Sequence, residues 1–468
     1  MEKLSKKITG EVVITDQISS ELQKEIKNIA NYKQKIEEVL EGRITEILEI
    51  ILGGAIQLDA SDVHIEPKEK EAKIRIRIDG LLQDILFLNK EIYQSLLSRI
   101  KLVSGLKLNI TDRPQDGRFS ISLPQSQSPK QENSVRYEIE IRSSSLPTEY
   151  GETIVLRILN PKSLIDVEAL GLRDDLFALF TKEIKQPNGM IIVTGPTGSG
   201  KTTTLYAFLK KIQKPETKII TIEDPIEYHL KGITQTQVTA PKGLSQTVGS
   251  TSESIKSSLR IPVYYNFANG LRAIMRQDPD VILVGEIRDL ETATIALQAA
   301  LTGHLVFTTL HTNDAAGTVA RLQALGEKPV NIAPAINLAI AQRLVRKVCQ
   351  KCARAEPVSL SVLNKIKKQL KGLAPNVKHP KLDKKLKIPI AVGCKGCNNT
   401  GYKGRAGIFE ALVIDDEMEK FILTAPSITG LQEKAVKKGM VTMHQDGLLK
   451  VLEQITTIEE VERVTGEK

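Results

Sequence analysis

Residues 190–211 read MIIVTGPTGSGKTTTLYAFLKK, and this stretch decides the fold. A short apolar strand leads into G-x-x-x-x-G-K-T, and the chain continues as a helix, which is the order of a phosphate-binding loop in an α/β domain. Glycines let backbone N–H groups curl around phosphate oxygens, the lysine reaches the β- and γ-phosphates, and the threonine hydroxyl reaches Mg²⁺. The alternative is a glycine-rich turn without a ligand, and both flanks argue against it. The predicted nucleotide-binding residues here are Gly195, Pro196, Thr197, Gly198, Ser199, Gly200, Lys201, Thr202 and Thr203.

Further apolar runs predict strands of the same sheet. They show little alternation and are bounded by polar or glycine residues, as is typical of parallel strands buried on both faces. Glu223 and Asp224 end one run, and Glu286 follows another. Because the carboxyl ends of parallel strands converge on a ligand crevice, we expect these acids near the phosphates, although a single strand-end acid is usually a solvated carboxylate. The runs are residues 190–193, 219–222, 281–284 and 305–307.

Two histidines, His304 and His311, bracket the last of these strands. A single histidine is more often an ordinary polar residue than a catalyst. Here the position at the end of a fourth strand of the same sheet suits a side chain that responds to a bound phosphate. We therefore assign His304 to nucleotide binding. Metal ligation and simple capping are the alternatives.

The region before the P-loop has a different pattern. Residues 1–42 predict an amphipathic helical lead-in, and 44–58 predict another helix. The run 73–78 alternates strictly and closes on Asp79-Gly80, as a hairpin does. Together with the β-type runs 63–65, 137–142 and 153–159, this indicates an α+β domain.

The four cysteines form two CxxC pairs, and they predict a metal site. Four thiolates are the closed tetrahedral set that structural Zn²⁺ prefers, and the alternative is a set of reduced core thiols. The pairs are separated by 42 positions, from 352 to 394, so we expect the chain between them to form a lobe of its own. The predicted ligands are Cys349, Cys352, Cys394 and Cys397.

Composition places the chain among soluble globular proteins. Its 468 residues are 41% hydrophobic and 26% charged, and 65 Lys and Arg against 56 Asp and Glu give a net charge of +9, which favours acidic partners. With no Trp, 9 Phe and 9 Tyr, an array of base-stacking aromatics is not expected. The N-terminus lacks the apolar core of a signal peptide, and the longest uncharged stretch, 330–342, is too short for a spanning helix. We therefore expect a cytoplasmic protein whose membrane contact is peripheral.

Four segments in order resemble the Walker A, Asp-box, Walker B and His-box motifs of the type II/type IV secretion ATPases. They are GPTGSGKTTTLY at 195–206, TIEDPIEY at 221–228, GLRAIMRQDPDVILVGEIRDLETA at 270–293 and TGHLVFTTLHTN at 302–313. The chain is most similar to the type II secretion and type IV pilus assembly branch, the GspE/PilB family. Three further segments and the paired CxxC extend the resemblance over roughly 45–465: ASDVHIEP at 60–67, RPQDGR at 113–118 and SSLPTEYGETIVLRIL at 144–159.

The resemblance implies a homohexameric ring that hydrolyses ATP with Mg²⁺ at subunit interfaces. It gives Glu286 the Walker B role, Glu223 the Asp-box role of placing water, and His311 a His-box role. It also implies that Arg142 and Arg157 reach phosphate when the ring closes. Asp224 is assigned to nucleotide binding with the P-loop.

The resemblance also implies five regions. These are a lead-in at 1–42, a PAS-like α+β domain at 43–165, a RecA-like P-loop ATPase domain at 166–345, a four-cysteine zinc module at 346–405 and a mostly helical C-terminal region at 406–468. Two departures from the family stand out. About 42 residues precede the match, where larger members carry an additional domain that docks onto membrane-platform proteins. Residues 243–266 form an insertion that reads as a solvent loop rather than a partner-binding arm.

These observations predict an ATPase that powers assembly of a type IV pilus-like filament or a type II secretion pseudopilus. Its expected partner is an inner-membrane platform protein, and no nucleic acid is expected. The alternatives are a competence or retraction ATPase of the same superfamily, which generally lacks the cysteine module, a nucleic-acid translocating P-loop ATPase, and a scaffold that binds ATP without hydrolysing it.

Overall fold

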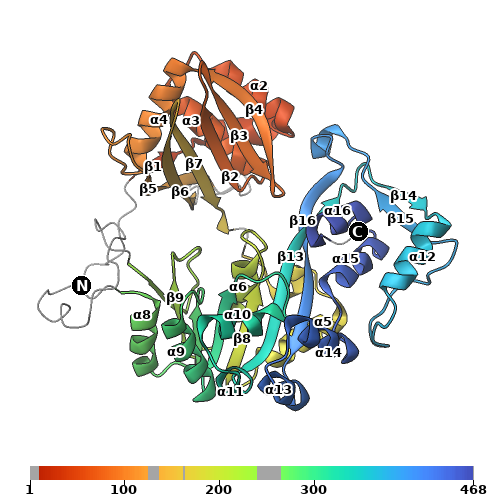
Figure 1. Ribbon diagram of the computed structural model, residues 1–468. Coiled ribbons are helices and arrows are strands. Elements are labelled where there is room, and N and C mark those ends of the chain that lie inside the picture. Colours follow the sequence, from red (N-terminus) through yellow and green to blue (C-terminus); the bar gives the residue numbers. More distant parts are fainter. Residues whose placement is uncertain (1–9, 125–135, 162–163, 240–264, 467–468) are drawn as a thin grey trace, which may run out of the picture. The chain divides into compact units, whose positions relative to one another are not determined.

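The computed structural model describes residues 10–124, 136–161, 164–239 and 265–466 (Figure 1). The described chain forms two compact units. Unit 1 takes in Met1–Ser163, Arg346–Arg354 and Ile390–Gly404, and unit 2 takes in Leu164–Val345, Ala355–Pro389 and Arg405–Lys468. Most of the insertion expected at 243–266 lies outside the described residues.

Unit 1 is built on a seven-stranded sheet in the order β1-β5-β6-β7-β2-β3-β4. All neighbouring strands pair antiparallel except β1 and β5, which are parallel. The predicted turn at Asp79 and Gly80 joins β3 to β4, with positive φ angles of 49° and 83° at the two residues. The elements are β1 Glu11–Val13, α1 Asp16–Glu25, α2 Ile29–Val39, α3 Ile44–Gln57, β2 Asp62–Pro67, β3 Glu71–Ile78, β4 Leu81–Asn89, α4 Lys90–Val103, β5 Gln115–Pro124, β6 Arg136–Thr148 and β7 Gly151–Leu159.

One face of this sheet packs against the helices, and the other carries charged side chains. On β3, Ile74 and Ile76 are buried in the core, whereas Arg75 and Arg77 point to the opposite face. The described part of the expected lead-in is not a separate element. Helices α1 and α2 share the same core, and the Tyr32 hydroxyl donates to the carbonyl of Ile51 at 2.6 Å, so the amphipathic pattern marks a face buried within unit 1.

Unit 2 contains a second seven-stranded sheet, in the order β10-β9-β11-β12-β8-β13-β16. From β10 to β13 every neighbouring pair is parallel. The elements that precede the cysteine pairs are η2 Val167–Leu170, α5 Asp174–Glu183, β8 Gly189–Thr194, α6 Lys201–Ile212, β9 Ile219–Glu223, β10 Thr234–Gln237, α8 Phe267–Ile274, η3 Met275–Gln277, β11 Val281–Val284, α9 Leu290–Leu301, β12 Leu305–Leu310, α10 Gly317–Leu325, α11 Pro329–Ile332 and β13 Ile336–Val348.

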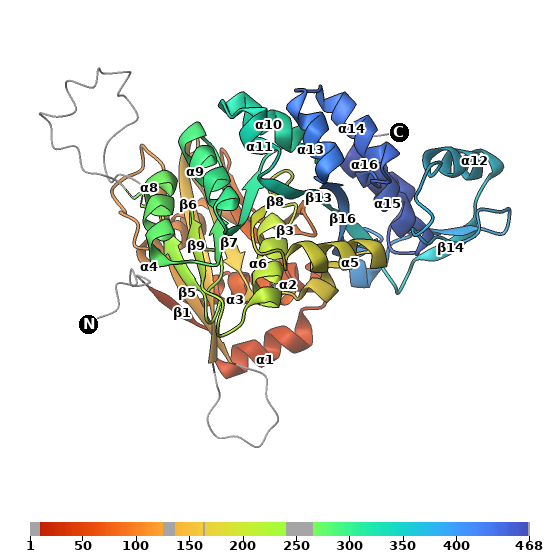
Figure 2. The same cartoon turned by 90° about the horizontal axis from the view of Figure 1, so that it is seen from below.

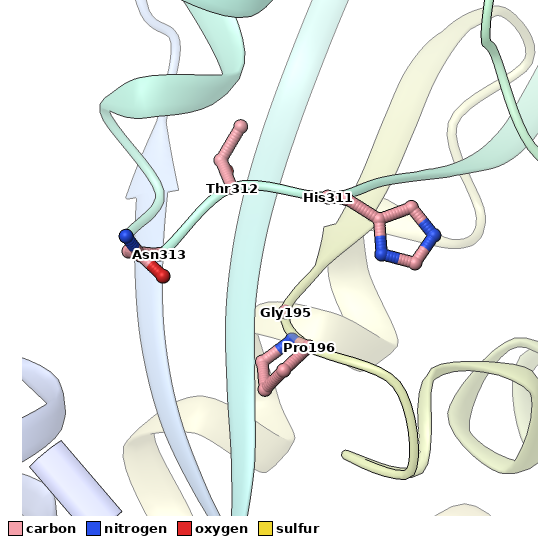
Figure 3. A pocket seen from close by; sticks show the side chains of 5 residues that line it. All are labelled: Gly195, Pro196, His311, Thr312 and Asn313. Carbon is pink, nitrogen blue, oxygen red and sulfur yellow. The ribbon is translucent and has the colours of Figure 1, made fainter.

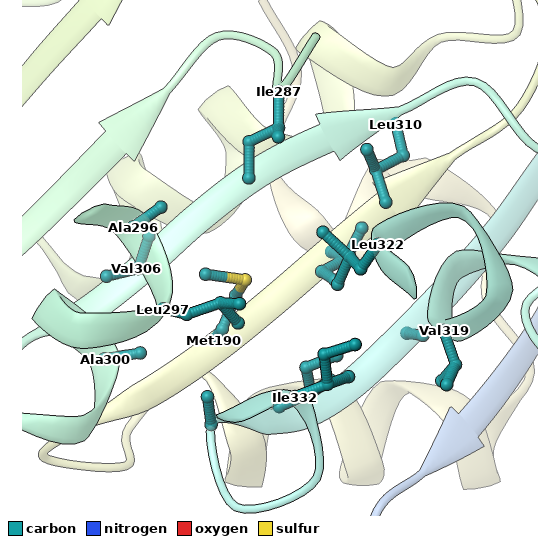
Figure 4. Close-up of a cluster of buried hydrophobic side chains, with 14 of the residues drawn as sticks. Met190, Ile287, Ala296, Leu297, Ala300, Val306, Leu310, Val319, Leu322 and Ile332 are labelled. Carbon is teal, nitrogen blue, oxygen red and sulfur yellow. The ribbon is translucent and has the colours of Figure 1, made fainter. Parts of the chain in front are cut away.

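Strand β8 explains why the apolar runs do not alternate. Met190 and Ile192 belong to one hydrophobic core, while Ile191 and Val193 belong to another on the opposite face. Figure 4 shows the first core, in which Met190 and Val306 pack beneath Leu297 of α9 and Leu322 of α10. Both faces of the parallel sheet are therefore covered, as the runs predicted.

The C-terminal region begins with the strand β16 and continues as helices, so the expected mostly helical character from residue 406 is confirmed apart from this strand. Strand β16 lies at the edge of the unit 2 sheet beside β13, and helices α13 to α16 group next to these strands (Figure 2). From the sequence alone, an apolar run of this length is compatible with either a helix or a strand. In the folded unit, the pairing of this segment with β13 makes it a strand. The remaining elements are β14 Arg354–Pro357, α12 Leu360–Gln369, β15 Lys387–Ile390, η4 Lys395–Cys397, β16 Tyr402–Val413, α13 Asp416–Leu423, α14 Ile428–Lys437, α15 Met443–Leu452 and α16 Ile458–Thr465.

The segment between the cysteine pairs does not form an isolated lobe. Leu363 and Ile366 of α12 share a hydrophobic core with Leu448 and Leu449 of α15, so the segment is packed into unit 2. Among the described residues, no helix combines the length and the apolar character needed to cross a membrane.

Candidate nucleotide-binding site

The P-loop joins the end of β8 to the start of α6, as its sequence requires. Gly195, Gly198 and Gly200 have φ angles of 148°, 78° and 89°, which side chains other than glycine rarely adopt. A Cβ atom at Gly195 would also lie 2.4 Å from the carbonyl oxygen of Gln342 on β13. The loop is therefore fixed in a turn that presents its backbone to a ligand.

Lys201, the first residue of α6, folds back over this loop. Its Nζ donates to the carbonyl oxygens of Gly195 at 2.8 Å and Pro196 at 3.2 Å. Burial lowers the pKa of Lys201, and the negative charges of Glu286 and Glu227 oppose that shift. The buried hydroxyl of Ser199 has no hydrogen-bond partner among the described residues. The donors and the lysine fit the phosphates of a nucleotide, and the neighbouring Thr202 supplies the hydroxyl suited to Mg²⁺.

Glu286 lies at the carboxyl end of β11 and has cationic and imidazole neighbours. Arg288 pairs with Glu286 and approaches Asp224 Oδ2 at 3.8 Å, so it holds the ends of two strands together. His311 Nε2 lies 3.6 Å from Glu286 Oε2. Burial lowers the pKa of His311, the positive charges of Lys201 and Arg288 lower it further, and Glu286 opposes them. The ring is therefore neutral at pH 7.

Glu223 faces the interior of unit 2 rather than the P-loop lysine. It accepts hydrogen bonds from the hydroxyls of Tyr206 and Thr221 and from Gln235 Nε2, the last at 3.2 Å. Burial raises the pKa of Glu223, while these three hydrogen bonds lower it. The side chain is thus a fixed acceptor at the end of β9.

Sequence reasoning missed Glu227, the second glutamate of TIEDPIEY. Its negative charge raises the pKa of both Lys201 and Glu223, so it lies near the P-loop lysine and the buried acid. The sequence offered one signal for this residue, namely that Glu223 and Glu227 stand in the same motif at the end of a predicted strand. Arg288 was missed as well, because its role depends on pairing with acids from two strands.

The loop after β12 completes the site. Gly195, Pro196, His311, Thr312 and Asn313 line a pocket of about 220 Å³ (Figure 3). The hydroxyls of Thr194 and Thr312 lie 2.8 Å apart, and the Thr312 N–H donates to Thr194 Oγ1 at 2.8 Å. The loop is therefore tied to the last residue of the strand that carries the P-loop.

His304 does not join this site. It lies before the first residue of β12, and its carbonyl accepts the N–H of Gly189, the first residue of β8. Its ring Nδ1 lies 3.0 Å from the carbonyl oxygen of Ala299. Because β8 and β12 are parallel, His304 and the P-loop lie at opposite ends of the strands, and the structure supports capping at this position.

Arg142 and Arg157 belong to unit 1, where they occupy facing positions on β6 and β7. Arg157 Nε donates to Asp62 Oδ1 at 3.1 Å, and Arg77 Nε lies 3.3 Å from Asp62 Oδ2. Arg142 Nε donates to Glu140 Oε1 at 3.4 Å. Asp62 is 5% exposed, so a buried carboxylate orients two arginines on the charged face of the sheet.

The four cysteines lie together in unit 1. Their sulfur atoms are all within 4.8 Å of one another, and Cys349–Cys394 and Cys352–Cys397 are separated by 4.0 and 3.8 Å. Four thiols at this spacing fit the tetrahedral thiolate site that Zn²⁺ prefers. The adjoining segment packs on unit 1 through Asn398 Oδ1, which accepts the N–H of Ile29 at 2.8 Å.

Comparisons with known proteins show which family the chain resembles. The family model described as Type II/IV secretion system protein matches residues 37–463. The chain is 43% identical over 428 residues to the type II secretion system protein E of Dickeya dadantii, covering 91% of this chain and 76% of that protein. It is 40% identical over 433 residues to the type IV pilus assembly ATPase PilB of Thermus thermophilus, covering 91% of this chain but 43% of that longer protein.

Solved structures include a similar motor. The crystal structure of the pilus retraction motor PilT with bound ADP matches with a TM-score of 0.53 and 25% identity, covering 88% of this chain and 95% of that chain.

Proposed function

The chain belongs to the type II/IV secretion system proteins, and on this premise we propose that it is a hexameric ATPase that powers assembly of a type IV pilus-like filament or a type II secretion pseudopilus. The single observation that carries the proposal is the convergence of Lys201, Glu286 and His311 at one end of the parallel sheet. A lysine for phosphate and a carboxylate for water at one crevice are the elements of nucleotide hydrolysis.

In the proposed reaction, water attacks the γ-phosphorus of ATP, a new P–O bond forms, and the bond to the β-phosphate oxygen breaks to release ADP and phosphate. The P-loop N–H groups and Lys201 bind the phosphates, and Thr202 holds Mg²⁺, which neutralises phosphate charge when bound. Glu286 accepts a hydrogen bond from the attacking water and receives the proton that the water loses, which then passes to solvent. Glu223 fixes the end of β9, and Glu227 and Arg288 set the charge around the lysine and Glu286.

Arg142 and Arg157 are proposed to act from unit 1 of a neighbouring subunit in the ring. A guanidinium neutralises charge that spreads over the γ-phosphoryl oxygens. Before the ring closes, Asp62 orients the guanidinium of Arg157. Supply of these groups by a separate unit couples hydrolysis to motion between units.

The remaining assignments are part of the same proposal. Residues 43–165 are a PAS-like domain within unit 1, residues 166–345 are a RecA-like motor within unit 2, and the cysteine cluster holds a structural Zn²⁺. The protein acts at the cytoplasmic face of the inner membrane as a peripheral protein, where it contacts a membrane platform protein. No role for nucleic acid is proposed.

An assembly or secretion function is favoured over retraction. The two relatives described above are a secretion protein and an assembly ATPase with identities of 43% and 40%, whereas the retraction motor is 25% identical. The paired cysteines point the same way.

Steady-state ATP hydrolysis tests the proposal. The purified full chain with Mg²⁺ is expected to hydrolyse ATP, and Lys201→Ala and Glu286→Gln are each expected to reduce kcat by at least about a hundredfold. Lys210→Ala on the same helix, where the lysine pairs with exposed Asp166, is the matched control. Unchanged turnover in either site variant would disprove the assignment. Stimulation by DNA that falls steeply with salt would favour the translocase instead.

A further inference from the structure

Glu410 on β16 is a buried carboxylate that the proposed reaction does not use. Its side chain is 3% exposed. One oxygen, Oε1, accepts the backbone N–H of Ala315 at 2.9 Å. The other, Oε2, accepts the N–H of Met443 and the side-chain amide of Gln432, both at 3.2 Å. Glu410 therefore joins the loop after β12 to helices α14 and α15.

The chemistry of this position requires a carboxylate. Three N–H donors converge on its two oxygens, and Met443 is the first residue of α15, where the helix dipole favours negative charge. An amide in the same place would turn an NH₂ group toward at least one of the donors. Burial raises the pKa of Glu410, whereas the hydrogen bonds from Ala315, Met443 and Gln432 lower it.

Ala315 belongs to the loop that lines the phosphate pocket. Thr312 anchors the near part of this loop to Thr194, and Thr312 Oγ1 donates to the carbonyl of Asp314 at 2.9 Å. The bond from Ala315 to Glu410 anchors the far part. The loop thus has one anchor on the P-loop strand and one on the C-terminal region.

A second link runs from the same loop to the last helix. Arg343 on β13 donates to the carbonyl of Val464 on α16 at 2.8 Å, and its other terminal nitrogen lies 3.5 Å from Asn313 Oδ1. Three C-terminal helices are therefore linked to the segment that carries His311, two of them through Glu410 and the third through Arg343.

We propose that Glu410 is a positioning residue for ATP hydrolysis. Its carboxylate holds the loop at 311–315 against the P-loop, so the C-terminal helices determine where His311 stands relative to Glu286. This inference rests on the proposed hydrolysis at the P-loop. It predicts an effect on turnover rather than on affinity, because nucleotide binding depends chiefly on the P-loop backbone, Lys201 and Thr202.

The test is a double-mutant cycle on the full chain between Glu410→Gln and His311→Ala. Glu410→Gln is expected to lower kcat on the order of tenfold, with the KM for ATP changed less than about twofold. In the His311→Ala background the same substitution is expected to lower kcat less than about twofold, because its effect passes through that residue. If Glu410→Gln does not fold, Glu410→Asp replaces it; this variant keeps the charge, and its oxygens no longer span the three donors.

Asp446→Asn is the matched control. Asp446 is also a buried carboxylate, and it accepts the N–H of Phe409, the neighbour of Glu410, at 2.8 Å. Its other partner, Arg173, keeps an ion pair with Asp175 in the variant. The control is expected to lose stability and to retain kcat per folded enzyme.

Two results would overturn the inference. One is an unchanged kcat in Glu410→Gln, and the other is an equal loss in both backgrounds, which indicates a structural role only. If the proposed function itself were wrong, the result would differ from both of these, because the wild-type chain would then show no ATP hydrolysis that depends on Lys201.

Discussion

Arg142 on β6 and Arg157 on β7 occupy directly opposite positions in the antiparallel pairing of the two strands. The same row of the sheet continues to Asp62 on β2 and Arg77 on β3. Opposed like charges destabilise a sheet unless a counter-charge or a ligand offsets them. Asp62 supplies one counter-charge within the row, and the phosphate that we propose for this face would supply another.

The arginine pair should therefore affect catalysis more than binding. Arg142→Ala and Arg157→Ala are each expected to lower kcat by about tenfold or more, because the guanidinium stabilises charge that develops in the transition state. The Kd for a fluorescent ATP analogue should change less than about threefold. Arg75→Ala is the matched control, since Arg75 lies on the same face but pairs with Glu66 and Asp84. A main effect on Kd would contradict the closure role.

The pH dependence of kcat should reflect the protonation state of His311. Its pKa lies below the ordinary 6.5, so the ring is neutral at pH 7 and gains a proton as the pH falls through that lowered value. The charged ring would pair with Glu286 and withdraw the carboxylate from water. We expect kcat to fall below pH 6.5 in the wild type, and this limb to move to lower pH in His311→Ala. A profile with the same acid limb in both proteins would count against the assignment.

The contribution of His311 to the stability of the fold should also decrease as the pH falls. Because the unfolded chain binds this proton more readily than the folded chain, the contribution of His311 to the free energy of unfolding rises with pH through the interval between the two pKa values. Chemical denaturation at pH 5.5 and 7.5, with His311→Ala as reference, measures that contribution. A larger contribution at pH 5.5 would be inconsistent with the lowered pKa.

Metal analysis should find one zinc per chain. Cys394→Ser is expected to abolish stoichiometric zinc and to lower the Tm, since binding energy at a closed structural site is folding energy. Ser427→Ala, which removes a helix cap on α14 away from the cysteines, should retain zinc. A zinc-free and fully folded wild-type preparation would refute the site.

Breaking the buried pair of Lys101 and Glu152 on one side should destabilise unit 1. Lys101 Nζ donates to both carboxylate oxygens, at 3.0 and 2.8 Å, and the residues are 2% and 4% exposed. Lys101→Met is expected to cost about 3–5 kcal/mol, because it leaves a carboxylate buried without its partner. Lys101→Met combined with Glu152→Gln should cost less than the single change. Denaturant-induced unfolding, monitored with a probe in unit 1, measures these losses of stability. A double variant whose loss equals the sum of the two single losses would argue against a stabilising interaction between Lys101 and Glu152.

The nucleotide site could be predicted where its information is local. The P-loop, its flanking strand and helix, and Glu286 follow from short-range patterns, because apolar runs and glycines act on adjacent residues. The arrangement of Glu223 and Glu227 could not be predicted, since it depends on how Tyr206 and Gln235 reach the end of β9. His304 was misplaced because the polarity of a parallel strand decides which end meets the ligand.

Long-range register explains the other differences. The row of Asp62 and its arginines joins residues almost a hundred positions apart, and a shift of one residue in any strand would break it. The role of Glu410 likewise depends on two helices and a loop that meet only in the folded unit.

The cysteine pairs also determine how this protein can be dissected. They belong to unit 1, yet both follow the P-loop in the chain, and the segment between them returns to unit 2. A truncation or protease cut near residue 163 therefore does not yield two self-contained fragments. The fragment that carries the motor would retain the cysteine segments and expose the surface around Asn398 and Gly404 that packs on Ile29 and Asp79.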